Sequence, residues 1–293
     1  MSIDAHVKYN ESVRILMERY FKRHNDIPNR LYHYTSAGGL HGIASNKTIF
    51  LTNARFLNDP GELIYAANLV RASVAIARDQ RGSVLDDFLK HIENILDPDK
   101  LTLEAYVSCF CEDGDLLSQW RSYGGNADGY AIGFDFSGIN WSTHADKAPP
   151  PELRKVLYCH KEQATFISEW TNAIADLIEE TGDEISDNQL QQFRKTVAEC
   201  MITFKSPAYQ EEQEWRLISV QQHPKDLKFL AQARFLKPYV EFKPNGGLPI
   251  RSVKVGPVLN FDLTKRSVTM MLDYYEYDKI DEMKPSSILY RPS

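Results

Sequence analysis

The order of the strand and helix patterns constrains the fold of this chain more than any other feature. Segments typical of strands, such as "AYVSCFCE", "GYAIGFDF" and "QEWRLISV", alternate with helical patterns at irregular intervals. Most links between the strands are too short or too irregular for the strand–helix–strand repeat of a doubly wound sheet. The sequence therefore predicts an α+β fold with a mainly antiparallel, split sheet and flanking helices.

The domain organisation follows from the same reading. The segment "APPPE" is the one candidate linker, but strand patterns on both sides of it read as parts of one sheet. We therefore expect a single domain over residues 1–293. An amphipathic helix is expected over residues 10–24, and a helical insert at about residues 161–204 forms a subdomain at most.

Composition and charge exclude several classes of protein. The chain is 43% hydrophobic and 25% charged, and it lacks the run of about 18 apolar residues that a membrane helix needs. The start "MSIDAHVKYNES" has no signal-peptide pattern, so we expect a cytoplasmic protein without a membrane partner. A net charge of −6 argues against a broad basic face for nucleic acid. The cysteines show no paired metal-ligand spacing, and no metal is expected.

The segment "LYHYTSAGGLHGIASNKTIF" places a histidine in an unusual position. Residues 30–35 read as a strand with His33 at its centre, and residues 37–45 read as a short helix. A polar ring is tolerated there if it lines a cleft, and the Gly-Gly after it permits a ligand to approach the backbone. The alternative is that His33 bonds to a backbone carbonyl in a sealed core.

Two further segments supply candidate residues. "FLNDPGELIYAAN" opens a long helix with Asp59 as N-cap and Glu62 three residues later, a capping-box pattern, and Tyr65 follows one turn on. In "EEQEWRLI", Glu212 and Glu214 are expected on one strand, pointing to the same side. Such a pair is stable only if both carboxylates are solvated, or if one is protonated or has a cationic partner.

Several motifs resemble one bacterial family of unknown function, the domain-of-unknown-function family 2971. They are "YHYTS", "FLNDPGE", "SCFCE", "LLSQWRSYGGNADGYAIGF", "EEQEWRL", "VKVGP" and "SSILYR", in this order over nearly the whole chain. Cys111 departs from the serine expected at its position. This resemblance names no activity.

The chain also resembles, more loosely, ADP-ribosyltransferases of the His-Tyr-Glu type. In those enzymes an aromatic-His-x-Thr/Ser strand comes first, a helix later supplies a tyrosine, and a glutamate begins a core strand. The matching residues are His33, Tyr65 and Glu214, and Glu212-x-Glu214 resembles the Glu-x-Glu of the arginine-modifying branch. The resemblance implies an ADP-ribosyltransferase-like fold with NAD as substrate.

The resemblance also implies roles for these residues. Glu214 stabilises the positive charge that develops on the ribose, Glu212 accepts a proton from the nucleophile, and His33 fixes the ribose. Tyr65 holds the nicotinamide ring, because an aromatic face suits a flat ring. Further contacts to NAD are expected from the first strand and from the turn before the long helix, namely Tyr34, Thr35, Ser36 and Asn58.

The leading interpretation is an NAD-consuming ADP-ribosyltransferase-like enzyme or an NAD glycohydrolase. Small proteins of this type serve as toxins or phage-defence effectors, so a macromolecular acceptor (protein or nucleic acid) and a neutralising or regulatory protein are implied partners. Two alternatives remain open. One is a non-catalytic regulatory or nucleotide-sensing module. The other is a metal-dependent nuclease that uses Asp59, Glu62, Glu212 and Glu214, although helix capping already explains the first two.

Overall fold

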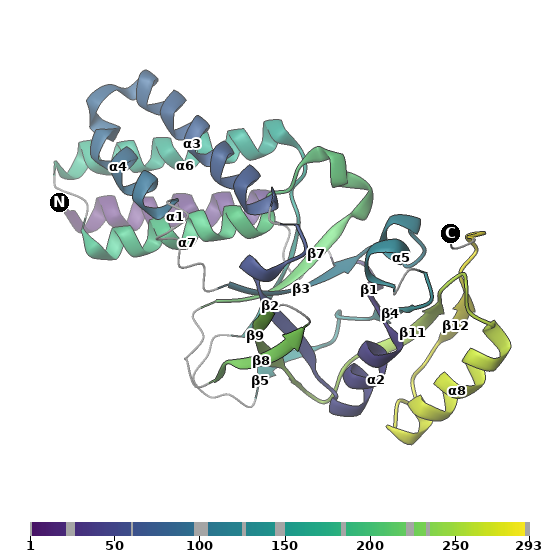
Figure 1. The fold of residues 1–293 in the computed structure, drawn as a ribbon. Coiled ribbons are helices and arrows are strands. Elements are labelled where there is room, and N and C mark those ends of the chain that lie inside the picture. The colour runs from purple at the N-terminus through teal and green to yellow at the C-terminus, as the bar shows by residue number, and fades with distance from the viewer. Residues whose placement is uncertain are drawn as a thin grey trace. The chain divides into compact units, whose positions relative to one another are not determined.

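The computed structural model describes residues 2–21, 27–59, 61–96, 105–124, 127–143, 150–182, 186–220, 226–232 and 235–290 (Figure 1). The chain divides into two compact units, each assembled from three separate stretches of sequence. The first unit holds residues 1–23, 53–105 and 155–210, and the second holds residues 24–52, 106–154 and 211–293. The single domain expected over residues 1–293 stays a prediction.

The first unit is built from helices. α1 begins at Ser2, so the helix expected over residues 10–24 extends further toward the N-terminus, and residues 22–24 lie outside the described residues. The expected helical insert consists of α6 and α7. The helices of this unit are α1 (Ser2–Tyr20), η2 (Ala54–Phe56), α3 (Gly61–Arg81), η3 (Gly82–Leu85), α4 (Asp86–Ile95), α6 (His160–Thr181) and α7 (Asp187–Thr203).

Aromatic side chains fill the core of the helical unit. α6 packs against α1 and α3, and α3 also packs against α7 (Figure 1). Between these helices, the Phe193 ring lies edge-on to Phe88 at 5.1 Å and to Trp170 at 6.2 Å between ring centroids. All three side chains are fully buried. Burying each such side chain contributes about 1.5–3 kcal/mol, so amphipathic patterning holds this unit together.

The second unit is built around a ten-stranded sheet with the order β12-β11-β4-β1-β3-β2-β9-β8, and β7 pairs with both β3 and β6. The pairs β1–β3, β1–β4, β4–β11, β2–β9 and β8–β9 are antiparallel, and β11–β12 is parallel. A small second sheet joins β5 to β10. The strands are β1 (Leu31–Thr35), β2 (Ile49–Asn53), β3 (Ala105–Cys111), β4 (Tyr130–Phe134), β5 (Asn140–Thr143), β6 (Glu152–Lys155), β7 (Glu214–Val220), β8 (Lys228–Gln232), β9 (Phe235–Phe242), β10 (Pro244–Asn245), β11 (Ile250–Val255) and β12 (Glu282–Pro285).

The fold is therefore α+β, with a mixed, largely antiparallel sheet and flanking helices, as the sequence predicts. Helices α2 (Ala37–Asn46) and α8 (Phe261–Tyr274) contribute to the larger core of this unit, which also contains Leu31 and Phe110. The short helix α5 (Leu117–Tyr123) packs its Trp120 into a separate, smaller cluster with Tyr34. Among the described helices, none combines the length and the apolar character that crossing a bilayer requires.

Candidate functional site

His33 occupies the centre of β1 and is half-buried. Its Nδ1 donates a hydrogen bond to the carbonyl oxygen of Cys109 at 2.9 Å, and its ring lies 5.6 Å from the ring of Phe110. Burial lowers the pKa of His33, and the bond to the Cys109 carbonyl opposes this only in part. The ring is thus neutral at physiological pH, with Nε2 as a hydrogen-bond acceptor.

The packing of the turn after β1 requires a glycine at one of its two glycine positions. Ser36 is the N-cap of α2, and its Oγ accepts a hydrogen bond from the backbone N–H of Gly39 at 3.2 Å. A Cβ at Gly39 would lie 1.8 Å from Oγ1 of Thr35, so the close neighbour is a side chain of the same turn. Gly38 has open space, with Ser36 Oγ 3.9 Å from an added Cβ. The expected approach of a ligand to the backbone at these glycines stays a prediction.

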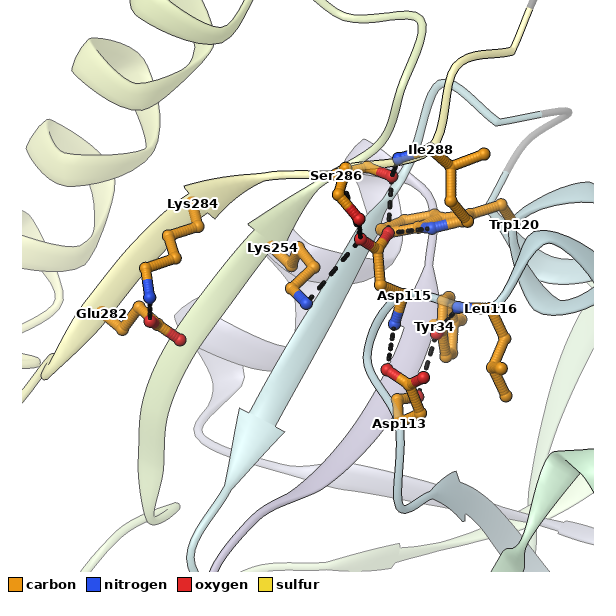
Figure 2. Close-up of polar contacts among 11 residues, drawn as sticks. Tyr34, Asp113, Asp115, Leu116, Trp120, Lys254, Glu282, Lys284, Ser286 and Ile288 are labelled. Atoms are coloured by element: carbon orange, nitrogen blue, oxygen red, sulfur yellow. Dashed lines mark hydrogen bonds and ion pairs between the residues drawn. The ribbon is translucent and has the colours of Figure 1, made fainter.

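Tyr34 points away from His33, to the other face of the sheet, and is buried. Its hydroxyl donates to the carbonyl oxygen of Asp113 at 3.0 Å and accepts from the N–H of Leu116 at 2.9 Å (Figure 2). Its ring lies edge-on to Trp120, with 4.8 Å between the ring centroids. Burial raises the pKa of Tyr34. These contacts join β1 to the loop before α5.

Asp115 is the centre of a polar network that the sequence patterns do not single out (Figure 2). Its carboxylate accepts hydrogen bonds from Trp120 Nε1 at 2.9 Å, from Ser286 Oγ at 2.5 Å, and from the N–H and Oγ of Ser287, both at 2.8 Å. Lys254 Nζ is 4.0 Å away. Burial raises the pKa of Asp115, but these hydrogen bonds together outweigh it, so the pKa is lowered. One carboxylate thus holds the segment after β12.

Glu214 is the first residue of β7 and is held by an arginine two residues later. Arg216 Nε is 2.7 Å from Oε1 of Glu214, and Nη2 is 3.0 Å from Oε2, which makes a two-point contact. Both side chains are buried, with the residues 3% and 1% exposed. Arg216 is therefore the cationic partner that a buried carboxylate at this position requires.

Glu212 does not share a strand with Glu214, so the expectation that both lie on one strand is wrong. Glu212 ends the short 3-10 helix η4 (Pro207–Glu212), and β7 begins only at Glu214. Between them, Gln213 has a φ of 41°, in the left-handed region. The rule that alternate residues face one side holds within a strand, and here the chain turns before the strand starts.

Strand alternation determines which face of the sheet each candidate occupies. Trp215 packs in the same core cluster as Phe110, and its Nε1 donates to Glu112 Oε1 at 2.8 Å. Glu214, the neighbour of Trp215, therefore points to the opposite face. His33 shares the face of Phe110, the ring with which it is in contact. The structure thus places His33 and Glu214 on opposite faces of the sheet.

Tyr65 and Asn58 belong to the first unit. The Tyr65 hydroxyl donates to Gln163 Oε1 at 2.7 Å, and Gln163 Nε2 donates to the carbonyl oxygens of Leu157 at 2.6 Å and Lys205 at 3.0 Å. Burial raises the pKa of Tyr65, and the bond to Gln163 opposes it. Asn58 is exposed, three residues before the described start of α3. The expected contacts of both residues with NAD stay predictions.

The "NDPGE" segment forms a second polar cluster in the first unit. Asp59 Oδ1 accepts from the N–H of Gly61 at 2.8 Å, in keeping with its expected place at the helix start. Glu62 has a further role, because its Oε1 is 2.9 Å from Lys205 Nζ and both side chains are buried. The Lys205 ammonium also lies 4.9 Å from the centroid of the Tyr209 ring.

This arrangement bears on the nuclease alternative. Lys205 neutralises Glu62, one of the four carboxylates that a nuclease would use. Within the described ranges, no group of three or more His, Cys, Asp and Glu side chains is placed to hold a metal ion. No observation in the structure therefore favours the nuclease.

Comparison with known proteins supports the family assignment but names no activity. Residues 119–217 match the profile of a family described as "Protein of unknown function (DUF2971)". The matched part includes two of the motifs on which the sequence-based assignment rests, "QWRSYGG" and "EEQEWRL". Comparisons with curated proteins and with solved structures find no match.

Proposed function

We propose that this protein is an NAD-consuming, ADP-ribosyltransferase-like enzyme or NAD glycohydrolase that acts as a toxin or phage-defence effector on a macromolecular target. The observation that carries the proposal is Glu214, a carboxylate fixed by Arg216 at the first residue of a core strand. Its strand β7 pairs with β3, which also pairs with the strand that contains His33. Along the sequence, His33 and Glu214 follow one another in the order that the transferase resemblance implies.

The chemistry requires an ionised carboxylate at a rigid position. The bond between ribose C1′ and the nicotinamide nitrogen breaks, and its electron pair stays on the neutral nicotinamide. A water or acceptor nucleophile then forms the new bond to C1′ and loses its proton. A carboxylate beside C1′ stabilises the positive charge that develops in between. Arg216 supports this role, because its guanidinium supplies an opposite charge in contact with the Glu214 carboxylate.

The proposal rests on Glu214 rather than on a triad. His33 lies on the other face of the sheet at β3, so it is not a direct partner of the Glu214 carboxylate in this structure. The roles of His33, Tyr65, Thr35, Ser36 and Asn58 come from the resemblance alone. Variants of these residues therefore test the resemblance, whereas a variant of Glu214 tests the proposal.

The test is nicotinamide release from NAD by the wild type and by Glu214→Gln. Because the carboxylate acts mainly in the transition state, turnover should fall about 100- to 1000-fold while NAD affinity changes little. Glu212→Gln is the matched control, since it removes the same charge two residues earlier. It should spare NAD hydrolysis and impair transfer to an acceptor. Wild-type nicotinamide release by a folded Glu214→Gln protein would refute the proposed role of Glu214.

A second candidate function, a non-catalytic nucleotide-sensing module, is favoured by one observation. The Glu214 carboxylate is buried, both of its oxygens are bound by Arg216, and it faces away from His33. Such a pair suits a structural role as well as a catalytic one. Calorimetric titration with NAD and with ADP-ribose distinguishes the two candidates. Binding without any nicotinamide release by the wild type would support the sensing module.

A further inference from the structure

Helix α8 buries one face and exposes an apolar stripe on another. Thr264, Val268 and Leu272 point into the sheet unit. The exposed stripe consists of Leu263, Met270 and Tyr274, whose residues are 70%, 65% and 80% exposed. Positions separated by seven and four residues lie along one line of a helix. The helix is therefore apolar on two sides, of which the fold covers one.

One cationic and one anionic side chain lie beside the stripe, in a fixed order along the helix. Arg266 and Asp273 lie seven residues apart on the same flank, and both are exposed. Within the described part of the chain, neither side chain takes part in an ion pair. The cation therefore lies toward the start of the stripe and the anion toward its end. Figure 1 shows α8 in yellow beside β11 and β12.

We propose that the stripe on α8 binds the same stripe of a second copy of this chain, with the two helices antiparallel about a two-fold axis. Antiparallel pairing brings the early half of one helix beside the late half of the other. Arg266 of each copy then lies beside Asp273 of the other, and the two Met270 side chains meet near the axis. A parallel pair about a two-fold axis along the helices would place the Arg266 flanks of the two copies on opposite sides of the interface, so neither Arg266 would meet an Asp273. The charge order therefore selects the antiparallel copy.

The size of the stripe sets the strength of association. Stable interfaces usually bury about 1,200–2,000 Å² in total, and one short helix pair buries less. We therefore expect a reversible dimer that forms at roughly micromolar concentration. Leu263 and Tyr274 lie at the two ends of the stripe, so each packs near the other in the antiparallel pair.

Sedimentation velocity over a range of concentrations tests the proposal with charge-swap variants of the full chain. The wild type should dimerise, and Arg266→Asp and Asp273→Arg should each weaken the dimer about tenfold or more, because like charges then meet. The double variant should recover the wild-type affinity. An equimolar mixture of the two single variants should form heterodimers, since one copy then carries two anions and the other two cations. Lys265→Asp makes the same charge change on the same helix away from the stripe and should have no effect.

Three outcomes would overturn the proposal. The first is a wild type that stays monomeric at every concentration. The second is a dimer that Arg266→Asp and Met270→Lys leave unchanged, which would place the interface elsewhere. The third is a mixture of the single variants that associates no better than each alone. Circular dichroism verifies that each variant is folded, which is expected because all the substituted side chains are exposed.

Discussion

Glu62 in the helical unit and Asp115 in the sheet unit are two largely enclosed carboxylates that are stabilised in different ways. In the helical unit, Glu62 lies against the ammonium of Lys205, and both side chains are at least nine-tenths buried. In the sheet unit, Asp115 is surrounded by hydroxyl and N–H donors, and its nearest cation is 4.0 Å away. The first arrangement depends on a matched charge. The second depends on a segment distant in sequence, which donates hydrogen bonds. Mutations should therefore act through different mechanisms at Glu62 and at Asp115.

The largest effect is expected where a matched charge is removed. Lys205→Met leaves Glu62 buried without its ammonium, and the free energy of unfolding should fall by about 3–5 kcal/mol. Urea unfolding measures the loss. Combining Lys205→Met with Glu62→Leu should recover much of it, because an apolar pair needs no compensating charge.

The exposed pair Lys8–Glu180 is the control for this experiment. Its side chains are 60% and 47% exposed, so Lys8→Ala should cost less than about 1 kcal/mol. A double variant at residues 205 and 62 that is no more stable than Lys205→Met would show that packing, rather than charge, dominates in the helical unit.

A smaller effect is expected from Asp115→Asn. Hydrogen bonds to a charged group are worth about 1.5–3 kcal/mol, and part of this energy holds only the segment after β12. Hydrogen exchange at residues 286–288 should therefore accelerate more than exchange in the central strands. Asp135→Asn is the control, because the bonds of Asp135 go to Ser137. It should leave residues 286–288 protected.

The pH dependence of the hydrogen bonds between Asp115 and the segment after β12 has a definite sign. The pKa of Asp115 is lowered from its ordinary value of 3.8, so the folded state favours the ionised form. Its contribution to stability is complete above the ordinary value and is lost as the pH falls through the lowered one. The protection factors of residues 286–288, relative to the intrinsic exchange rate at each pH, should fall only below about pH 4. Loss of protection near neutral pH would contradict this account.

The smallest effects are expected at the helix caps, one in each unit. Ser186 caps α7 in a full capping box, in which Gln189 Oε1 accepts from the Ser186 N–H at 2.6 Å. Ser36 caps α2 through its bond to the Gly39 N–H. Either serine-to-alanine change should cost about 1 kcal/mol in thermal or urea unfolding, and serine-to-glycine only a few tenths. If Ser36→Ala reduces NAD binding without this loss of stability, the resemblance-based role of Ser36 gains support.

Much of the fold could be predicted because it depends on local pattern. Alternation and helix capping predicted the strand around His33, the helix after it and the helix that starts beyond Asp59. Helical periodicity also predicted the helical insert, which consists of α6 and α7. The two-unit division was not predicted, because each unit is assembled from stretches that are distant in sequence.

The candidate site was harder to predict for the same reason. Glu212 and Glu214 are separated by a turn at Gln213. This turn depends on the positive φ of Gln213, which the residue pattern does not predict. Glu62 read as part of a cap, and its bond to Lys205 joins residues more than a hundred positions apart. The sequence did not predict that the two serines of "SSILYR" donate hydrogen bonds to Asp115, because serines are common residues in irregular segments. Arg216 could have been expected, since a buried strand carboxylate needs a cation two residues away on the same face.

The strand order of the sheet unit has a consequence for synthesis of the chain. β4 and β1 pair early in the sequence, but β11 and β12 extend that same sheet, and they come from residues 250–285. The serines that bind Asp115 follow directly after them. A nascent chain on the ribosome therefore cannot complete this sheet until residues 250–285 have emerged. The last helix of the helical unit ends at Thr203, so the helical segments emerge from the ribosome about eighty residues before the end of β12. The segments of the helical unit are therefore synthesised before those that complete the sheet.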